Sequence, residues 1–168
     1  MKKRLSVRPN VLITIVLMAL CALPVLAHHS FAMYDQTKTV TWTGVVVGFS
    51  GQANHAELQF IVIAPDGKPM LEKDKEGKVI PGKYVRWGVE MAGAAAVAQQ
   101  GITATSFANG TVFSVKLNPM RDGSNFGSRT GAIAKCPTNE ATGKPTPPAA
   151  GKHCDSVPGF TLLGGSQF

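Results

Sequence analysis

The sequence lacks the motifs of the common enzyme classes. Its 168 residues contain no GxSxG segment, no evident Ser-His-Asp arrangement and no glycine-rich loop that would cradle a phosphate. Glu57 and Glu90 fall on separate expected strands, and two such carboxylates do not by themselves define an acid–base pair. We therefore expect a binding protein in preference to a conventional enzyme.

The sequence also lacks an apolar run long enough to cross a membrane. The first apolar stretch covers residues 11–20 and is closed by Pro24, whereas a membrane span needs roughly 20 residues. Four basic residues come before or within its start, and Val25-Leu26-Ala27 has the small residues that signal peptidase requires. We expect residues 1–27 to be a secretory signal peptide cleaved after Ala27, in preference to an uncleaved anchor. The mature protein would then be periplasmic or secreted, with no stable membrane anchor.

Clustered positive charge is absent from the expected mature chain. The full sequence has a net charge of +7, and residues 1–27 hold four basic and no acidic residues, so the mature chain carries +3. Nucleic-acid binders gather Lys and Arg on one surface, so we expect no nucleic-acid partner. The remaining length fits one domain, expected over residues 28–135.

Cysteine is scarce, with three residues in the chain, and Cys21 falls in the signal peptide. The remaining Cys136 and Cys154 predict one disulfide, as is usual for an even pair in an exported protein. It would close part of a flexible C-terminal extension over residues 136–168. The alternative is a thiolate metal site that includes His153, and an oxidising compartment disfavours it.

Short β-branched or alternating segments dominate the mature chain and predict a mostly β fold. A charged stretch at 66–83, punctuated by Gly and Pro, predicts a solvated hairpin extension, and 118–128 predicts a loop with turns. The Ala-rich segment 91–101 predicts one short helix that ends at Gly101. We expect a small antiparallel OB-like barrel or sandwich. The expected strands are 39–49, 56–64, 83–91, 110–117, 131–135 and 160–164.

Cleavage after Ala27 would make His28 the first residue of the mature protein. Its free α-amine and its imidazole titrate near pH 8 and 6.5, so both can act as neutral nitrogen donors to one metal ion. A third nitrogen would complete the tetragonal arrangement that Cu(II) prefers. We expect His55 to supply it, because His55 falls at a turn just before an expected strand. His29 is the second candidate, acting with the amine and its own amide.

The same histidines also have a simpler interpretation. His28 and His29 can be exposed residues with no ligand, and His55 in "GQANHAEL" can be a turn residue bonded to the backbone. Phe31 and Tyr34, just after the two histidines, can shield an axial metal position or pack onto the barrel. A metal-free domain that binds a small ligand or a protein is therefore the alternative function.

Several segments together resemble a family of small exported bacterial proteins of unknown function. They are "AHHSFAMYD", "TVTWTGVV", "VRWGVEM", "QQGIT" and "NPMRDGSNFGS", within residues 24–135. Mature chains of that family typically begin His-His-Ser-Phe, and members carry Asn-Pro-His where this chain has Ala53-Asn54-His55. They also have a Trp where this chain has Gly51. The resemblance implies an exported protein and assigns no activity.

The His-His start also resembles the histidine brace of certain secreted copper proteins. This resemblance implies one copper ion held by His28 and His55, or by His29. Oxygenases that use the brace on polymers present a flat aromatic surface, whereas only 7% of this chain is aromatic. Storage, delivery and sensing of the metal all remain open.

Overall fold

The computed structural model describes residues 31–52 and 54–165. The expected signal peptide, His28 and His29 lie outside the described residues. The described residues from Ala32 onward form one compact unit. No helix among the described residues is long and apolar enough to cross a membrane.

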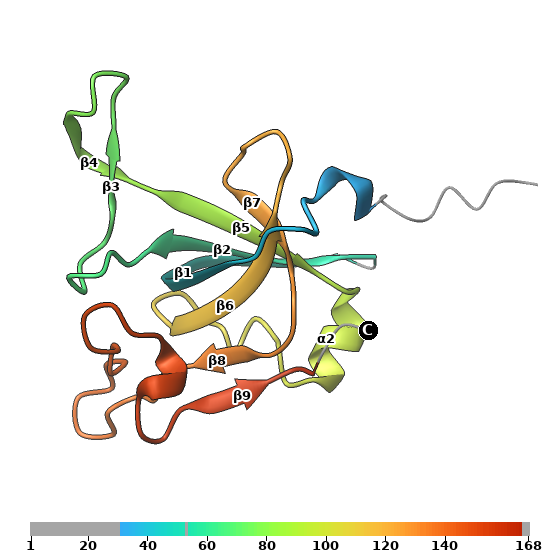
Figure 1. Cartoon of the computed structure of the whole chain (residues 1–168). Coiled ribbons are helices and arrows are strands. Elements are labelled where there is room, and N and C mark those ends of the chain that lie inside the picture. The colour runs from blue at the N-terminus through green and yellow to red at the C-terminus, as the bar shows by residue number, and fades with distance from the viewer. Residues whose placement is uncertain (1–30, 53, 166–168) are drawn as a thin grey trace, which may run out of the picture. The chain divides into compact units, whose positions relative to one another are not determined.

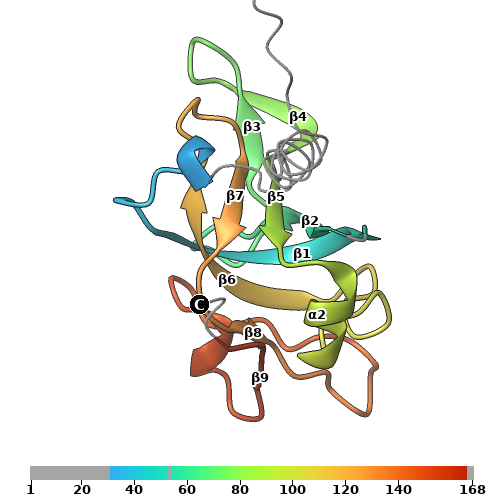
Figure 2. The same ribbon diagram turned by 90° about the vertical axis from the view of Figure 1, so that its right-hand side faces the viewer.

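Five strands close into a barrel (Figure 1). The order around the barrel is β1-β2-β5-β7-β6, and β1 pairs with both β2 and β6. Figure 2 shows β5 and β7 side by side with their arrows pointing the same way, and this is the one parallel pair in the barrel. A closed five-stranded barrel with this order confirms the expected OB-like fold. The strands are β1 (Val40–Gly51), β2 (Ala56–Val62), β5 (Arg86–Met91), β6 (Val112–Pro119) and β7 (Phe126–Arg129).

Strand β1 can pair with two neighbours because it bends along its length. Its first half pairs with β6 and its second half with β2, and the register shifts between Val46 and Gly48. Such a bulge increases the local twist and turns the strand toward its second partner. Gly44 lies where the two pairings overlap, and a Cβ there would collide with the Phe60 ring and lie 2.9 Å from the Ile61 carbonyl oxygen. A glycine is therefore required at the corner of the barrel.

The core fills the barrel with alternating side chains. In β2 the residues Ala56, Leu58, Phe60 and Val62 are buried, and the residues between them face outward. Phe60 and Phe107 each meet the Phe113 ring edge to face, with centroids 5.2 and 5.7 Å apart. The period of two that predicted this strand therefore reflects one buried and one open face.

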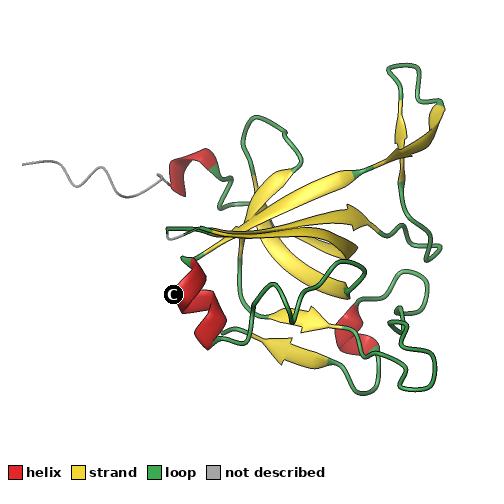
Figure 3. Cartoon of the chain, turned by 180° about the vertical axis from the view of Figure 1, so that it is seen from behind, coloured by secondary structure: helices red, strands yellow, loops and turns green. Residues whose placement is uncertain are grey.

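The remaining elements lie outside the five barrel strands. The hairpin of β3 (Leu71–Lys73) and β4 (Val79–Tyr84) projects away from it, as expected for the charged segment (Figure 3). Helix α2 (Ala94–Gln99) packs Val97 into the core, and Gly101, with φ of +80°, follows its end as expected. The 3-10 turns are η1 (Phe31–Met33) and η2 (Cys154–Ser156), and the last two strands are β8 (Ile133–Lys135) and β9 (Thr161–Leu163).

The C-terminal region continues the sheet instead of leaving it. Strand β9 pairs with β8, which pairs with β6. The expected disulfide is confirmed: Cys136 and Cys154 are bonded, with an S–S distance of 2.06 Å. Both cysteines are buried in a second apolar cluster with Val112, Ala134 and Val157. The residues on the two sides of the expected boundary after Lys135 thus belong to one compact unit.

Most expected strand bounds shift by one or two residues, and three expected elements differ from the structure by more than that. The strand predicted at 83–91 is interrupted at Val85, which separates β4 from β5. The helix predicted at 91–101 is shorter, because Met91 still pairs with Ala56 in the sheet. The loop predicted at 118–128 was wrong in part, since β6 runs to Pro119 and β7 begins at Phe126.

Candidate functional site

His55 lies in the turn between β1 and β2, directly before β2 begins. The Gln52 amide donates to the His55 carbonyl oxygen at 3.0 Å and closes the turn. The His55 side chain is 33% exposed, and its Nδ1 lies 3.3 Å from Glu90 Oε1. Its expected position at a turn ahead of a strand is confirmed. The carboxylate of Glu90 therefore fixes one nitrogen of a ring that solvent can reach.

Glu57 and Glu90 form an acidic pair on the outer face of β2 and β5. The strands are antiparallel and place the two residues directly opposite each other. Gln59 Nε2 donates to Glu57 Oε1 at 3.0 Å. Like charges in this position destabilise a sheet unless a positive group lies between them. His55 lies beside Glu90 on this face, and we call His55, Glu57 and Glu90 together the acidic cluster.

The first described segment of the chain contributes Tyr34 to the acidic cluster. Tyr34 is 2% exposed, and its Oη is fully buried. Burial raises the pKa of the Tyr34 hydroxyl, and the neighbouring Glu90 and Glu57 carboxylates raise it further. Tyr34 therefore stays neutral and places a buried O–H beside the two carboxylates. Of its two expected roles, packing onto the barrel is the one seen.

Backbone and side-chain bonds anchor the segment that carries Tyr34. The Asp35 amide donates to the Pro119 carbonyl oxygen at 2.8 Å, and the Arg121 amide donates to that of Met33 at 2.9 Å. Arg121 Nε also donates to the Tyr34 carbonyl oxygen at 3.1 Å. Arg121 thus binds the backbone of this segment through both its amide and its guanidinium group. The direction in which the chain enters the barrel is fixed at Tyr34.

The described residues do not contain a complete metal site. Within 31–52 and 54–165 no group of three or more His, Cys, Asp or Glu side chains is arranged to hold a metal ion. The thiolate site with His153 is ruled out, because Cys136 and Cys154 are joined to each other. His153 instead receives or donates a hydrogen bond at Nδ1, 2.8 Å from Thr43 Oγ1. Of the predicted ligands His28, His29 and His55, the structure places His55 alone.

Comparison with known proteins gives a family and no activity. A family model described as a family of unknown function (DUF6152) matches residues 16–130. The chain belongs to this family. The match includes the His28–His29 pair, the acidic cluster and all five barrel strands, and it ends before the disulfide. No curated protein and no solved structure shows significant similarity to the chain.

Membership confirms the expected family of unknown function and leaves the finer expectations as predictions. Among them are the mature start at His28 and the likeness to a histidine brace. The sequence pattern places Glu57 and Glu90 on separate strands and gives no sign that they lie near His55 or Tyr34. The strand register brings them together, and no local pattern in the sequence encodes it.

Proposed function

We propose that the protein is exported to the periplasm and there holds one copper ion at its mature N-terminus. Three nitrogens would bind the metal: the His28 α-amine, the His28 Nδ1 and the His55 Nε2. This set has the tetragonal nitrogen character that suits Cu(II). His29 is the alternative to His55, through the amine and its own amide. The disulfide is compatible with an extracellular location.

One observation carries the proposal: Tyr34 and His55 both lie at Glu90. His28 precedes Tyr34 by six residues, and six extended residues span up to about 20 Å. Because Tyr34 is anchored at the acidic cluster, a mature chain that began at His28 would be long enough for its first residue to reach His55. In the proposed site, that terminus would supply the two nitrogens that the barrel lacks.

Glu90 lies where it could support a metal-binding histidine without itself touching the metal. Its Oε1 lies 3.3 Å from His55 Nδ1, so the neutral ring would carry its hydrogen there and present Nε2 to the metal. Such carboxylate–histidine pairs hold the ring in place and raise its basicity. The negative charges of Glu57 and Glu90 would also balance the positive charge of a copper ion.

Copper titration of the mature protein, starting at His28, tests the proposal. We expect one tightly bound Cu(II) with an electron paramagnetic resonance spectrum of nitrogen coordination. His55→Ala should remove this spectrum, and Glu90→Gln should weaken binding by about 10–100-fold. His153→Ala is the matched control and should bind as the wild type does. Equal binding by the His55→Ala and wild-type proteins would point to His29 as the ligand, and absence of binding by the wild type would refute the proposal.

A further inference from the structure

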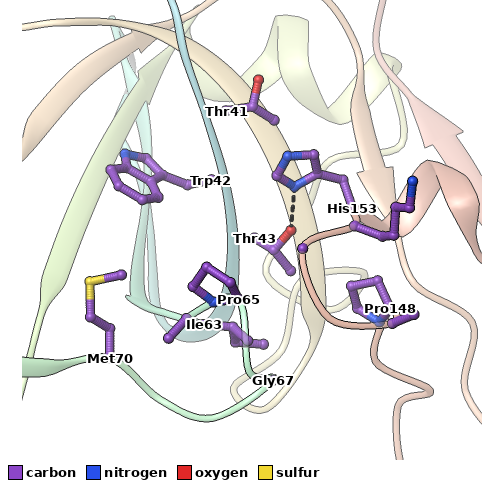
Figure 4. Close-up of a pocket in the computed structure, with 13 residues that line it drawn as sticks. Thr41, Trp42, Thr43, Ile63, Pro65, Gly67, Met70, Pro148 and His153 are labelled. Carbon is purple, nitrogen blue, oxygen red and sulfur yellow. Dashed lines mark hydrogen bonds between the residues drawn. The ribbon is translucent and has the colours of Figure 1, made fainter.

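A cavity of about 260 Å³ lies apart from the acidic cluster, between β1, the β2–β3 connection and the disulfide-closed segment. Figure 4 shows Trp42 and Met70 on one side and His153 and Pro148 on the other, with Pro65 between them. The Gly151 amide donates to the Pro65 carbonyl oxygen at 2.9 Å and joins the two walls. The volume falls just below the roughly 300–1,000 Å³ of small-molecule sites, so a small ligand fits and a polymer does not.

The apolar wall of the cavity packs against the core of the barrel. Trp42 packs against Trp87, with ring centroids 5.4 Å apart, and is partly buried on the core. Met70 is held by backbone bonds: its amide donates to Val62, and its carbonyl oxygen accepts from Val85. A preformed apolar wall of this kind lowers the ordering cost of binding the apolar body of a ligand.

A buried chain of hydroxyl groups fixes the hydrogen positions on His153. The Cys154 amide donates to Ser114 Oγ at 2.8 Å, Ser114 Oγ lies 2.7 Å from Thr43 Oγ1, and Thr43 Oγ1 lies 2.8 Å from His153 Nδ1. If Thr43 donated to Ser114, the Ser114 hydrogen would have no acceptor within the described part of the chain. Buried hydroxyl groups use their hydrogens, so Ser114 donates to Thr43, and Thr43 donates to Nδ1. The neutral His153 ring therefore carries its own hydrogen on Nε2.

The polar groups that line the cavity favour a negatively charged ligand. The lining residues include His153 and the exposed Lys152, and none of them is acidic. Asp66, in the adjoining turn, already accepts from the Lys68 amide at 3.0 Å. A carboxylate would accept a hydrogen bond from His153 Nε2, while its apolar part packs on Trp42 and Met70.

We propose that this cavity binds a small organic acid, with the carboxylate at His153 and the apolar body against Trp42 and Met70. The site is independent of the copper proposal, because it shares no residue with the acidic cluster. The disulfide has a direct role in it, since Cys154 adjoins His153 and holds the wall that carries it.

Phenylacetate and its uncharged analogue phenylacetamide are suitable probes. Ligand-detected NMR measures their binding to the exported protein, and amide chemical shifts locate the site. We expect the wild type to bind phenylacetate about tenfold more tightly than phenylacetamide, the effect of one charge-assisted hydrogen bond. His153→Phe keeps a ring and removes the donor, so this preference should vanish. Ala149→Trp fills the cavity from an exposed position without removing any hydrogen-bonding side chain and should abolish binding of both probes.

His55→Ala is the control and should leave both affinities unchanged, which separates this site from the copper site. Shifts confined to residues around Thr43 and His153 would support the proposal. Failure of the wild type to bind phenylacetate, a preference that survives His153→Phe, or binding that survives Ala149→Trp would each overturn it.

Discussion

Removal of the Cys136–Cys154 disulfide should destabilise the whole domain and not only the segment that it closes. The bond links residues 18 positions apart, and both cysteines are buried against Val112 and Ala134 of the sheet. Closing a loop of that length lowers the entropy of the unfolded chain and contributes about 3 kcal/mol to the free energy of unfolding. We take this as the expected loss in a Cys136→Ala/Cys154→Ala double variant.

Urea unfolding followed by tryptophan fluorescence measures the loss. With a urea dependence of about 1–3 kcal/mol/M for a small protein, a loss of about 3 kcal/mol lowers the midpoint by roughly 1–3 M. Ala150→Ser, an exposed change within the same loop, is the control and should not shift the midpoint. A loss below about 1 kcal/mol would refute the reasoning, because packing of η2 and β9 alone would then hold the segment.

Three further predictions test the fold and the anchored segment. Gly127→Ala should lower the free energy of unfolding by about 1–3 kcal/mol in a thermal unfolding experiment. The new Cβ would collide with Leu117 and lie 2.6 Å from the Asn118 carbonyl oxygen. Gly165→Ala is the control and should be neutral, because its Cβ would meet no atom within 4 Å. Hydrogen bonds from Thr37, followed by that from Lys38, lower the pKa of Asp35 to about 2. The Asp35 carboxylate therefore stabilises the folded state above pH 3.8, and this stabilisation is lost as the pH falls toward 2. A carboxyl NMR titration of Asp35 with a midpoint near 4 would contradict this. Burial raises the pKa of Tyr34, so above about pH 10 its hydroxyl ionises more readily in the unfolded chain than in the folded protein. The free energy of unfolding should therefore fall less above about pH 10 in Tyr34→Phe than in the wild type. Equal losses in the two proteins would count against this prediction.

The sequence predicted most of the barrel because its strands have one buried face. Alternation is regular in β2, where Leu58 and Phe60 are buried and Gln59 is exposed. Strand β7 was missed because it is short and its residues Gly127, Ser128 and Arg129 are all buried, so it shows no alternation. Pro119 was expected in the loop after this strand but is the last residue of β6, where a missing amide hydrogen is tolerated. Its carbonyl oxygen accepts from the Asp35 amide.

The candidate sites were less predictable than the fold. The location of His55 followed from the strand that it precedes. Its contact with Glu90, and the pairing of Glu90 with Glu57, depend on the register of β2 and β5, which local composition does not determine. The cavity draws residues from β1, the β2–β3 connection and the disulfide-closed segment, so its parts, such as Trp42 and His153, lie far apart in the sequence.

Native mass spectrometry of the protein purified from the periplasm, with and without one equivalent of Cu(II), tests the central proposal most directly. We expect a mass that begins at His28 and retains one copper ion, and loss of that ion from a variant with one Met added before His28. The added residue removes the α-amine from the metal site and leaves the barrel unchanged. A mass that begins at His28 without retained copper would contradict the account, as would one that still includes residues 1–27.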